Sequence, residues 1–327
     1  LVVFVQKVFK YTMVIQGIST VFLMLYWVRE YSFIKALGMG LFFSASSFCT
    51  AGFSVFGDSV MSYSSSAYIN LVLLITSYLG ACGFFVLYDL SMYFKNKLRK
   101  EKEIYRLSIH SRLVLVITFC LLFAGTLLVY TFENLLNPVG HQESLLEAFF
   151  QVGSASSTVG LNSTDISHYN YSSLLVLMML MFIGASPSGT GGGIKSTVFA
   201  ITLFSLYTFL ADRKQMTFFK RSIDNKTIAR ASSISFLAFG WFFLTLIILT
   251  ISDPELSFIH LAFEAVSANA CNGLSTGVTA SLSDLGKFVI IISILIGRVG
   301  PLVVGYSLIG RTERIDFEYP KGNVLIV

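Results

Sequence analysis

The segment FQVGSASSTVGL at residues 150–161 has two gapless counterparts in the same chain, FFSASSFCTAGF at 42–53 and FEAVSANACNGL at 263–274. In all three, a Phe stands ten residues before a Gly, a Ser stands six residues before it, and a bulky apolar residue follows it. Three unrelated helices that each end in Gly would explain the glycines but not the shared Phe and Ser. The offsets therefore favour an internal repeat.

Composition places this repeat in a membrane. The chain has 327 residues, of which 54% are hydrophobic and 13% are charged, whereas soluble domains carry about 25% charged residues. Apolar runs recur at close to the ~20 residues that a helix needs to cross a bilayer. A single large soluble core is excluded because too little polar surface would remain to cover it. We predict an all-α polytopic membrane protein.

Apolar runs flank each copy of the repeat. We expect leading spans near 11–28, 112–132 and 232–252, and returning spans near 68–90, 171–208 and 286–309. The predicted repeats cover 1–108, 109–230 and 231–327. Each would contain a span, a re-entrant loop and a second span, an order that resembles that of potassium channel subunits. The second span of the middle repeat is expected to be broken.

Charge patterning predicts the orientation. The linkers 94–112 and 211–230 are rich in Lys and Arg, whereas 131–147 contains Glu and neither basic residue. By the positive-inside rule, the basic linkers lie in the cytoplasm. Nucleic-acid binding by these linkers is the less favoured reading. Asp58, Asp165 and Asp284 follow the repeated segments, and they either attract cations to an outer mouth or are ordinary loop carboxylates.

Non-helical backbone at membrane depth is tolerated only where it is buried in protein or lines water. Several re-entrant loops around one axis direct carbonyl oxygens inward, where they can replace the hydration shell of an ion. Glycine suits such loops because it adopts backbone torsions that a Cβ disfavours. The repeat therefore predicts an ion pathway lined by backbone oxygens.

A second unusual segment, GASPSGTGGGIKST at 184–197, interrupts an otherwise apolar span. A loop at this depth must line a cavity, and we expect it to lie below the middle repeat segment as a gate. A phosphate-binding loop is excluded because Ile194 separates Gly193 from Lys195 and membrane spans flank the motif. Close helix packing explains small residues but not Pro187 next to a run of glycines.

Arg298 lies within the last apolar run, where a charge is costly and points to function. We expect it to face the pore interior near the Gly-rich loop. The alternative is a side chain that snorkels from a helix end.

The motifs TAGF (50–53), TVGL (158–161), GTGGGIKST (189–197) and GRVGPL (297–302), with the ending YPKGNVLIV, resemble the Trk/Ktr/HKT potassium transporters, especially the bacterial Ktr-type membrane subunit. The resemblance covers nearly the whole chain. It implies four repeats, of which this sequence contains the second, third and fourth. It also implies a multi-pass protein of the plasma membrane with a cytoplasmic C-terminus.

The resemblance assigns roles to residues. It implies a filter that binds K⁺ at the backbone oxygens of Thr50, Ala51, Gly52, Phe53, Thr158, Val159, Gly160, Leu161, Cys271, Asn272, Gly273 and Leu274. It implies a gate formed by Gly184, Gly189, Gly191, Gly192, Gly193, Lys195 and Arg298. The segment CNGL at 271–274 departs from the TVGL-like pattern. Na⁺ is therefore the alternative ion.

The resemblance further implies a homodimer and a cytosolic nucleotide-binding regulatory subunit similar to KtrA or TrkA. An enzyme is not expected, because the four histidines, His110, His141, His168 and His260, are dispersed, and no cofactor motif is present. The rival hypothesis is a secondary transporter with alternating access. It predicts one or two broken helices related by inverted symmetry.

Overall fold

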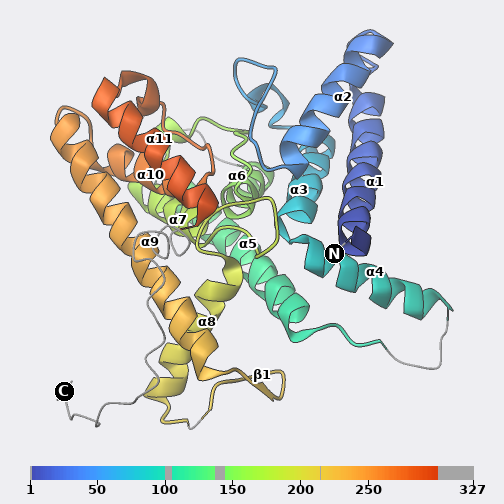
Figure 1. The fold of residues 1–327 in the computed structure, drawn as a ribbon. Helices are drawn as coiled ribbons and strands as arrows, with labels where there is room; N and C mark the ends of the chain where they lie inside the picture. Colours follow the sequence, from blue (N-terminus) through green and yellow to red (C-terminus); the bar gives the residue numbers. More distant parts are fainter. Residues whose placement is uncertain (1, 100–104, 137–143, 214, 301–327) are drawn as a thin grey trace.

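The computed structural model describes residues 2–99, 105–136, 144–213 and 215–300. The described part consists of helices and the loops that join them, and its strands form one hairpin in the second basic linker, where β1 (Thr217–Phe218) pairs antiparallel with β2 (Arg221–Ser222). The predicted all-α architecture is therefore confirmed (Figure 1).

Among the described residues, three helices are long and apolar enough to cross a membrane. They are α1 (Val2–Trp27), α5 (Ile109–Leu136) and α9 (Asn225–Ser252), and they cover the three expected leading spans to within one residue. Large apolar side chains lie on their outer surfaces, among them Phe119, Phe236 and Ile251. Such surfaces suit a lipid environment, where apolar side chains need no cover.

Each long helix is followed by a shorter one: α2 (Phe33–Phe48), α6 (Leu145–Ser157) and α10 (Phe258–Ala270). A single 3₁₀ turn comes next in each unit, as η1 (Met61–Tyr63), η2 (Ile166–His168) and η3 (Val278–Ser281). A returning helix then completes the unit. This order occurs three times in the described chain, as expected for a repeat.

The returning segment of the first unit differs from the prediction. Instead of one span over 68–90, α3 (Ala67–Ala81) and α4 (Phe84–Arg99) meet at an angle of 103°. Gly83 has φ +90° at the bend, and Phe84 N–H donates to the carbonyl of Ser188. Figure 1 shows that α4 runs across the end of α1, where the Tyr11 and Ser91 hydroxyls are 2.7 Å apart.

The other two returning segments agree better with the sequence. In the second unit, α7 (Tyr171–Ile183) and α8 (Ser196–Leu210) are separated by the predicted break. In the third, α11 (Asp284–Val299) covers the first part of the expected span 286–309, and 301–309 lie outside the described residues.

The second unit contributes to the two larger apolar cores of the described residues. One core joins α5, α6 and α7 to α10 and α11. The other joins α1, α2 and α3 to Phe150, Val159 and Leu161 of the second unit. The middle copy of the repeat is therefore packed between the other two, which positions the three repeated loops beside one another.

Candidate functional site: three converging loops and an intramembrane loop

The repeated loops share an unusual backbone. In each loop, φ is positive at two residues. The first lies one or two residues after the end of the short helix, and the second is the glycine two residues further on. These residues are Thr50 (49°) and Gly52 (70°), Thr158 (59°) and Gly160 (79°), and Cys271 (50°) and Gly273 (99°). Three of the six carry a Cβ, which makes this left-handed conformation uncommon. Its recurrence at matched positions shows that the sequence repeat is also a structural repeat.

The repeated serine holds each loop against its own helix. The Ser46, Ser154 and Ser267 carbonyls accept hydrogen bonds of 2.8, 3.1 and 2.9 Å from the N–H five residues later. The hydroxyls of Ser46 and Ser154 also donate to the carbonyls of the bulky residues after Gly, at 2.8 and 2.7 Å. In the third loop, the Ser267 hydroxyl instead accepts from Gly273 N–H at 3.2 Å.

The three loops lie side by side in one rotational sense. A Cβ on Gly52 would be 2.3 Å from the carbonyl oxygen of Val159, and a Cβ on Gly160 would be 2.1 Å from that of Asn272. In both contacts, the glycine of one repeated loop faces the carbonyl that precedes the glycine of the next loop. Only glycine permits this approach. The backbones of successive loops are therefore in direct contact.

Exposure distinguishes the loops. The middle loop is enclosed, with Val159 1% exposed, whereas Phe53 in the first loop is 69% exposed. Gly273 has Gly160 Cα at 3.8 Å as its nearest non-neighbouring atom from the Cβ side. Among the described residues, the glycine–carbonyl contact is thus made twice and the ring of loops is open on one side.

The intramembrane loop between α7 and α8 contacts the ends of all three short helices. The Thr190 hydroxyl donates to the Phe48 carbonyl of α2 at 2.9 Å, and Gly192 N–H donates to the Thr158 hydroxyl after α6 at 2.9 Å. A Cβ on Gly192 would be 1.9 Å from the Ala270 carbonyl of α10. Carboxyl ends of helices carry partial negative charge, so the loop covers a region that favours cations.

The glycines predicted for the gate lie at close backbone approaches. Gly184 and Gly193 pack directly on each other, and a Cβ on Gly189 would be 2.4 Å from the Ala81 carbonyl. A Cβ on Gly191 would be 2.4 Å from the Thr158 hydroxyl. Alanine at these positions would displace the loop from its neighbours.

Two cations hold the loop. Lys195 Nζ donates to the Gly191 carbonyl and an Arg298 guanidinium nitrogen donates to the Thr190 carbonyl, both at 2.6 Å. Arg298 lies in the last turn of α11, and its side chain is directed to the loop. Hydrogen bonds from charged donors are stronger than neutral ones. The two positive charges therefore fasten the loop and oppose a cation approaching it.

Several contacts of the loop 184–195 were not predicted from the sequence. They are the hydrogen bonds of the loop that use the Thr158 and Thr190 hydroxyls, and the packing against the bend at Gly83, where a Cβ would be 2.4 Å from the Pro187 carbonyl. The stretch GACG at 80–83 was the available signal for the bend, since it places two glycines in an apolar run. Nothing in the sequence indicates that this bend lies against the loop 184–195.

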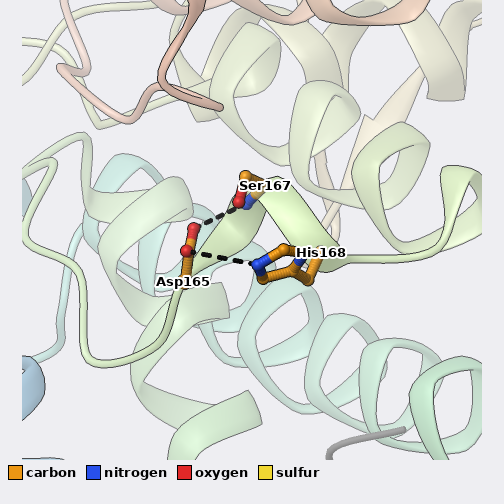
Figure 2. Close-up of polar contacts among 3 residues, drawn as sticks. All are labelled: Asp165, Ser167 and His168. Atoms are coloured by element: carbon orange, nitrogen blue, oxygen red, sulfur yellow. Dashed lines mark hydrogen bonds and ion pairs between the residues drawn. The ribbon is translucent and has the colours of Figure 1, made fainter.

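The acidic residues after the loops support local turns. Asp165 accepts a hydrogen bond from Ser167 N–H at 3.0 Å and lies 3.7 Å from the His168 imidazole (Figure 2). The bonds to Ser167 and the neighbouring His168 lower the pKa of Asp165. Asp58 accepts from Ser62 N–H at 3.0 Å, and Asp284 lies in the first turn of α11.

The described residues contain no cluster of three or more His, Cys, Asp or Glu side chains that could hold a metal ion.

Repeated spans with re-entrant helices and converging loops define a polytopic membrane protein of the pore-loop class. The chain belongs to the TrkH family of cation transport proteins, whose model matches residues 1–309.

Relatives support this assignment. The chain is 34% identical to the Ktr system potassium uptake protein B of Vibrio alginolyticus and 30% identical to the potassium/sodium uptake protein NtpJ of Enterococcus hirae. Both alignments cover 98% of this chain and 70% of the relative.

A solved structure has the same fold. The crystal structure of the potassium transporter TrkH from Vibrio parahaemolyticus matches with a TM-score of 0.67 and 19% identity, over 88% of this chain. The chain spans 61% of the length of that solved chain.

Proposed function

We propose that this chain is the ion-conducting membrane subunit of a potassium uptake system, with Na⁺ as a second permeant ion. The observation that carries the proposal is the repeated contact of Gly52 with the Val159 carbonyl and of Gly160 with the Asn272 carbonyl. This contact brings main-chain oxygens of successive loops together, which is the arrangement that replaces ion hydration in selectivity filters. The printed names of two relatives, potassium and potassium/sodium uptake proteins, agree with both ions.

The proposed filter consists of Thr50–Phe53, Thr158–Leu161 and Cys271–Leu274. Alternating positive φ values make successive carbonyls available on one side of the backbone. The Cys271–Leu274 segment keeps this backbone although its side chains depart from the other two. Because coordination by carbonyls does not depend on side-chain identity, we assign all three segments the same role.

The proposed gate is the loop 184–195 with Lys195 and Arg298. It spans the carboxyl ends of the three short helices and brings two positive charges next to them. A cation leaving the filter toward the cytoplasm would meet both. Ions would pass when the loop moves away from these helix ends.

The proposed function also implies partners and a cellular location. The names of relatives as Ktr system proteins support a cytosolic nucleotide-binding subunit that contacts the basic linkers. We also assign a homodimer, the plasma membrane and a cytoplasmic C-terminus.

The bend between α3 and α4 adds a second broken helix, which is one feature of alternating-access transporters. Both breaks, however, lie in a returning segment that follows a short helix and a 3₁₀ turn. They therefore occupy equivalent places in units of the same order, rather than inverted ones. This arrangement favours ion conduction over alternating access.

The test is Rb⁺ uptake with Na⁺ competition, in cells without their own potassium uptake, using the protein at its natural length. Gly160→Ser should abolish uptake or its ion preference because the Cβ meets the Asn272 carbonyl. Gly240→Ser is the matched control, since a Cβ there meets nothing within 4 Å. Unchanged uptake by an inserted Gly160→Ser variant would refute the filter assignment.

A further inference from the structure

The position nine residues before each filter glycine lies on a short helix, behind the loop. It is occupied by Phe43, Gln151 and Glu264 in the three units, and all three side chains are buried. This position was not part of the repeat pattern recognised from the sequence, because the three residues share neither size nor polarity. In the structure, each contacts the chain that leaves its own filter segment.

The contact has a different chemistry in each unit. In the first, the ring of Phe43 stacks on Phe56 with centroids 5.4 Å apart. In the second, Gln151 Oε1 accepts from the N–H and hydroxyl of Ser163 at 3.0 and 3.4 Å. All of these partners follow the filter glycine by three or four residues.

In the third unit, Glu264 is 4% exposed and both of its carboxylate oxygens are engaged. Oε1 accepts a short hydrogen bond from the Ser275 hydroxyl, and Oε2 accepts one of 2.7 Å from the Thr279 hydroxyl. Ser275 Oγ also accepts from Gly277 N–H at 2.9 Å. The carboxylate thereby holds the whole outgoing turn that begins directly after Leu274.

The third filter segment is supported on two sides. On one side the Asn272 carbonyl lies against Gly160 and Asn272 Nδ2 donates to the Ala155 carbonyl at 2.8 Å. Gly273 itself approaches no carbonyl as closely as Gly52 and Gly160 do among the described residues, and from behind its segment is held by Ser267 and by the turn that Glu264 fixes. Glu264 uses both of its carboxyl oxygens on this turn, whereas Gln151 uses one amide oxygen on Ser163, so the third turn is held at two points.

We propose that Glu264 is a positioning residue that sets the preference between K⁺ and Na⁺, because it fixes the carbonyl oxygens of the third filter segment through Ser275 and Thr279. This rests on the proposed conducting function. The two ions differ in size, so an oxygen cage that is held in place distinguishes them better than one that adapts to either. Loosening the turn should therefore lower discrimination more than it lowers transport.

The experiment measures Rb⁺ uptake and its competition by Na⁺ in proteoliposomes that contain the full-length protein. Glu264→Ala should reduce the preference for Rb⁺ over Na⁺ by about tenfold, the fold-change that corresponds to the loss of one hydrogen bond. Glu264→Gln should have a smaller effect because an amide retains one of the two acceptors. Glu147→Gln is the matched control, since it removes a buried carboxylate at the start of α6, where glutamine can still cap the helix.

A Glu264→Ala protein with wild-type discrimination would overturn the proposal. If that variant transports nothing, thermal unfolding of the purified protein in K⁺ and in Na⁺ decides, since a bound ion raises stability according to its affinity. Loss of the wild-type difference between the two ions would support the proposal, and a retained difference would overturn it. Absence of uptake by the wild-type protein would refute the conducting function itself.

Discussion

Replacing Gly192 with alanine tests whether the intramembrane loop is a gate. The added Cβ would lie 1.9 Å from the Ala270 carbonyl oxygen and 3.2 Å from Cys271 Cβ. The carbonyl belongs to the backbone at the end of α10, which cannot rotate away like the tip of a side chain. The loop must therefore shift by roughly 1 Å to relieve the overlap.

The shift has a calculable consequence. Overpacking of this kind costs about 1–3 kcal/mol, and the cost falls on the conformation in which the loop lies against α10. The same movement strains the 2.9 Å hydrogen bond from Gly192 N–H to Thr158. The ratio of covered to uncovered conformations should consequently fall by about fivefold to 150-fold.

The assay is the initial rate of Rb⁺ uptake with and without the regulatory subunit. Gly192→Ala should raise the rate measured without the regulator and reduce the stimulation by the regulator. Gly240→Ala is the control, because its Cβ meets nothing within 4 Å and alanine in a helix is favoured by about 1 kcal/mol over glycine. Its transport should match the wild type.

A Gly192→Ala protein that inserts normally and shows wild-type, regulated uptake would refute the gating role. So would a variant whose loop is displaced, as shown by accessibility of a cysteine introduced there, without any change in flux. Either result would leave the loop as a structural element.

Three further predictions follow from named contacts. Lys195→Met removes the bond to the Gly191 carbonyl and should raise unregulated Rb⁺ flux about tenfold; patch-clamp recording of open probability checks this, and an unchanged value would count against it. Gly160→Ala should reduce Rb⁺ uptake by the folded protein as well as lower its thermal stability. A variant with lower thermal stability but wild-type Rb⁺ uptake would contradict the filter assignment. Burial of Asp253 raises its pKa, but hydrogen bonds from Ser252 and Ser283 outweigh this effect and hold the pKa below the usual value. Because the folded-state pKa is lowered, Asp253→Asn should destabilise the protein above about pH 4, and the difference in stability from the wild type should shrink as the pH falls below that value. A pH-independent difference in thermal unfolding would show that the charge is unimportant.

Much of the fold was determined by local features of the sequence. Composition indicates a membrane environment, because only 13% of the residues are charged, about half the share in soluble domains. The matched Phe, Ser and Gly offsets located the three loops, since each Ser bonds within its own helix and loop. The Gly-rich stretch at 184–195 marked a broken helix because its residues disfavour helix wherever they occur.

Contacts between distant segments were decided by the tertiary structure. The bond between Thr190 and the Phe48 carbonyl joins residues 142 positions apart, and no local pattern encodes such a pair. The bend at Gly83 likewise exists because the loop around Pro187 packs against it, although the apolar run itself favours a continuous helix. The position nine residues before Gly52, Gly160 and Gly273 likewise could not be recognised from the sequence. Its occupants, Phe43, Gln151 and Glu264, look unrelated in sequence and become equivalent only when three loops fold back on three helices. Helix formation and hydrophobicity act over a few residues, whereas the packing that assembles the site acts between segments that only the folded chain brings together.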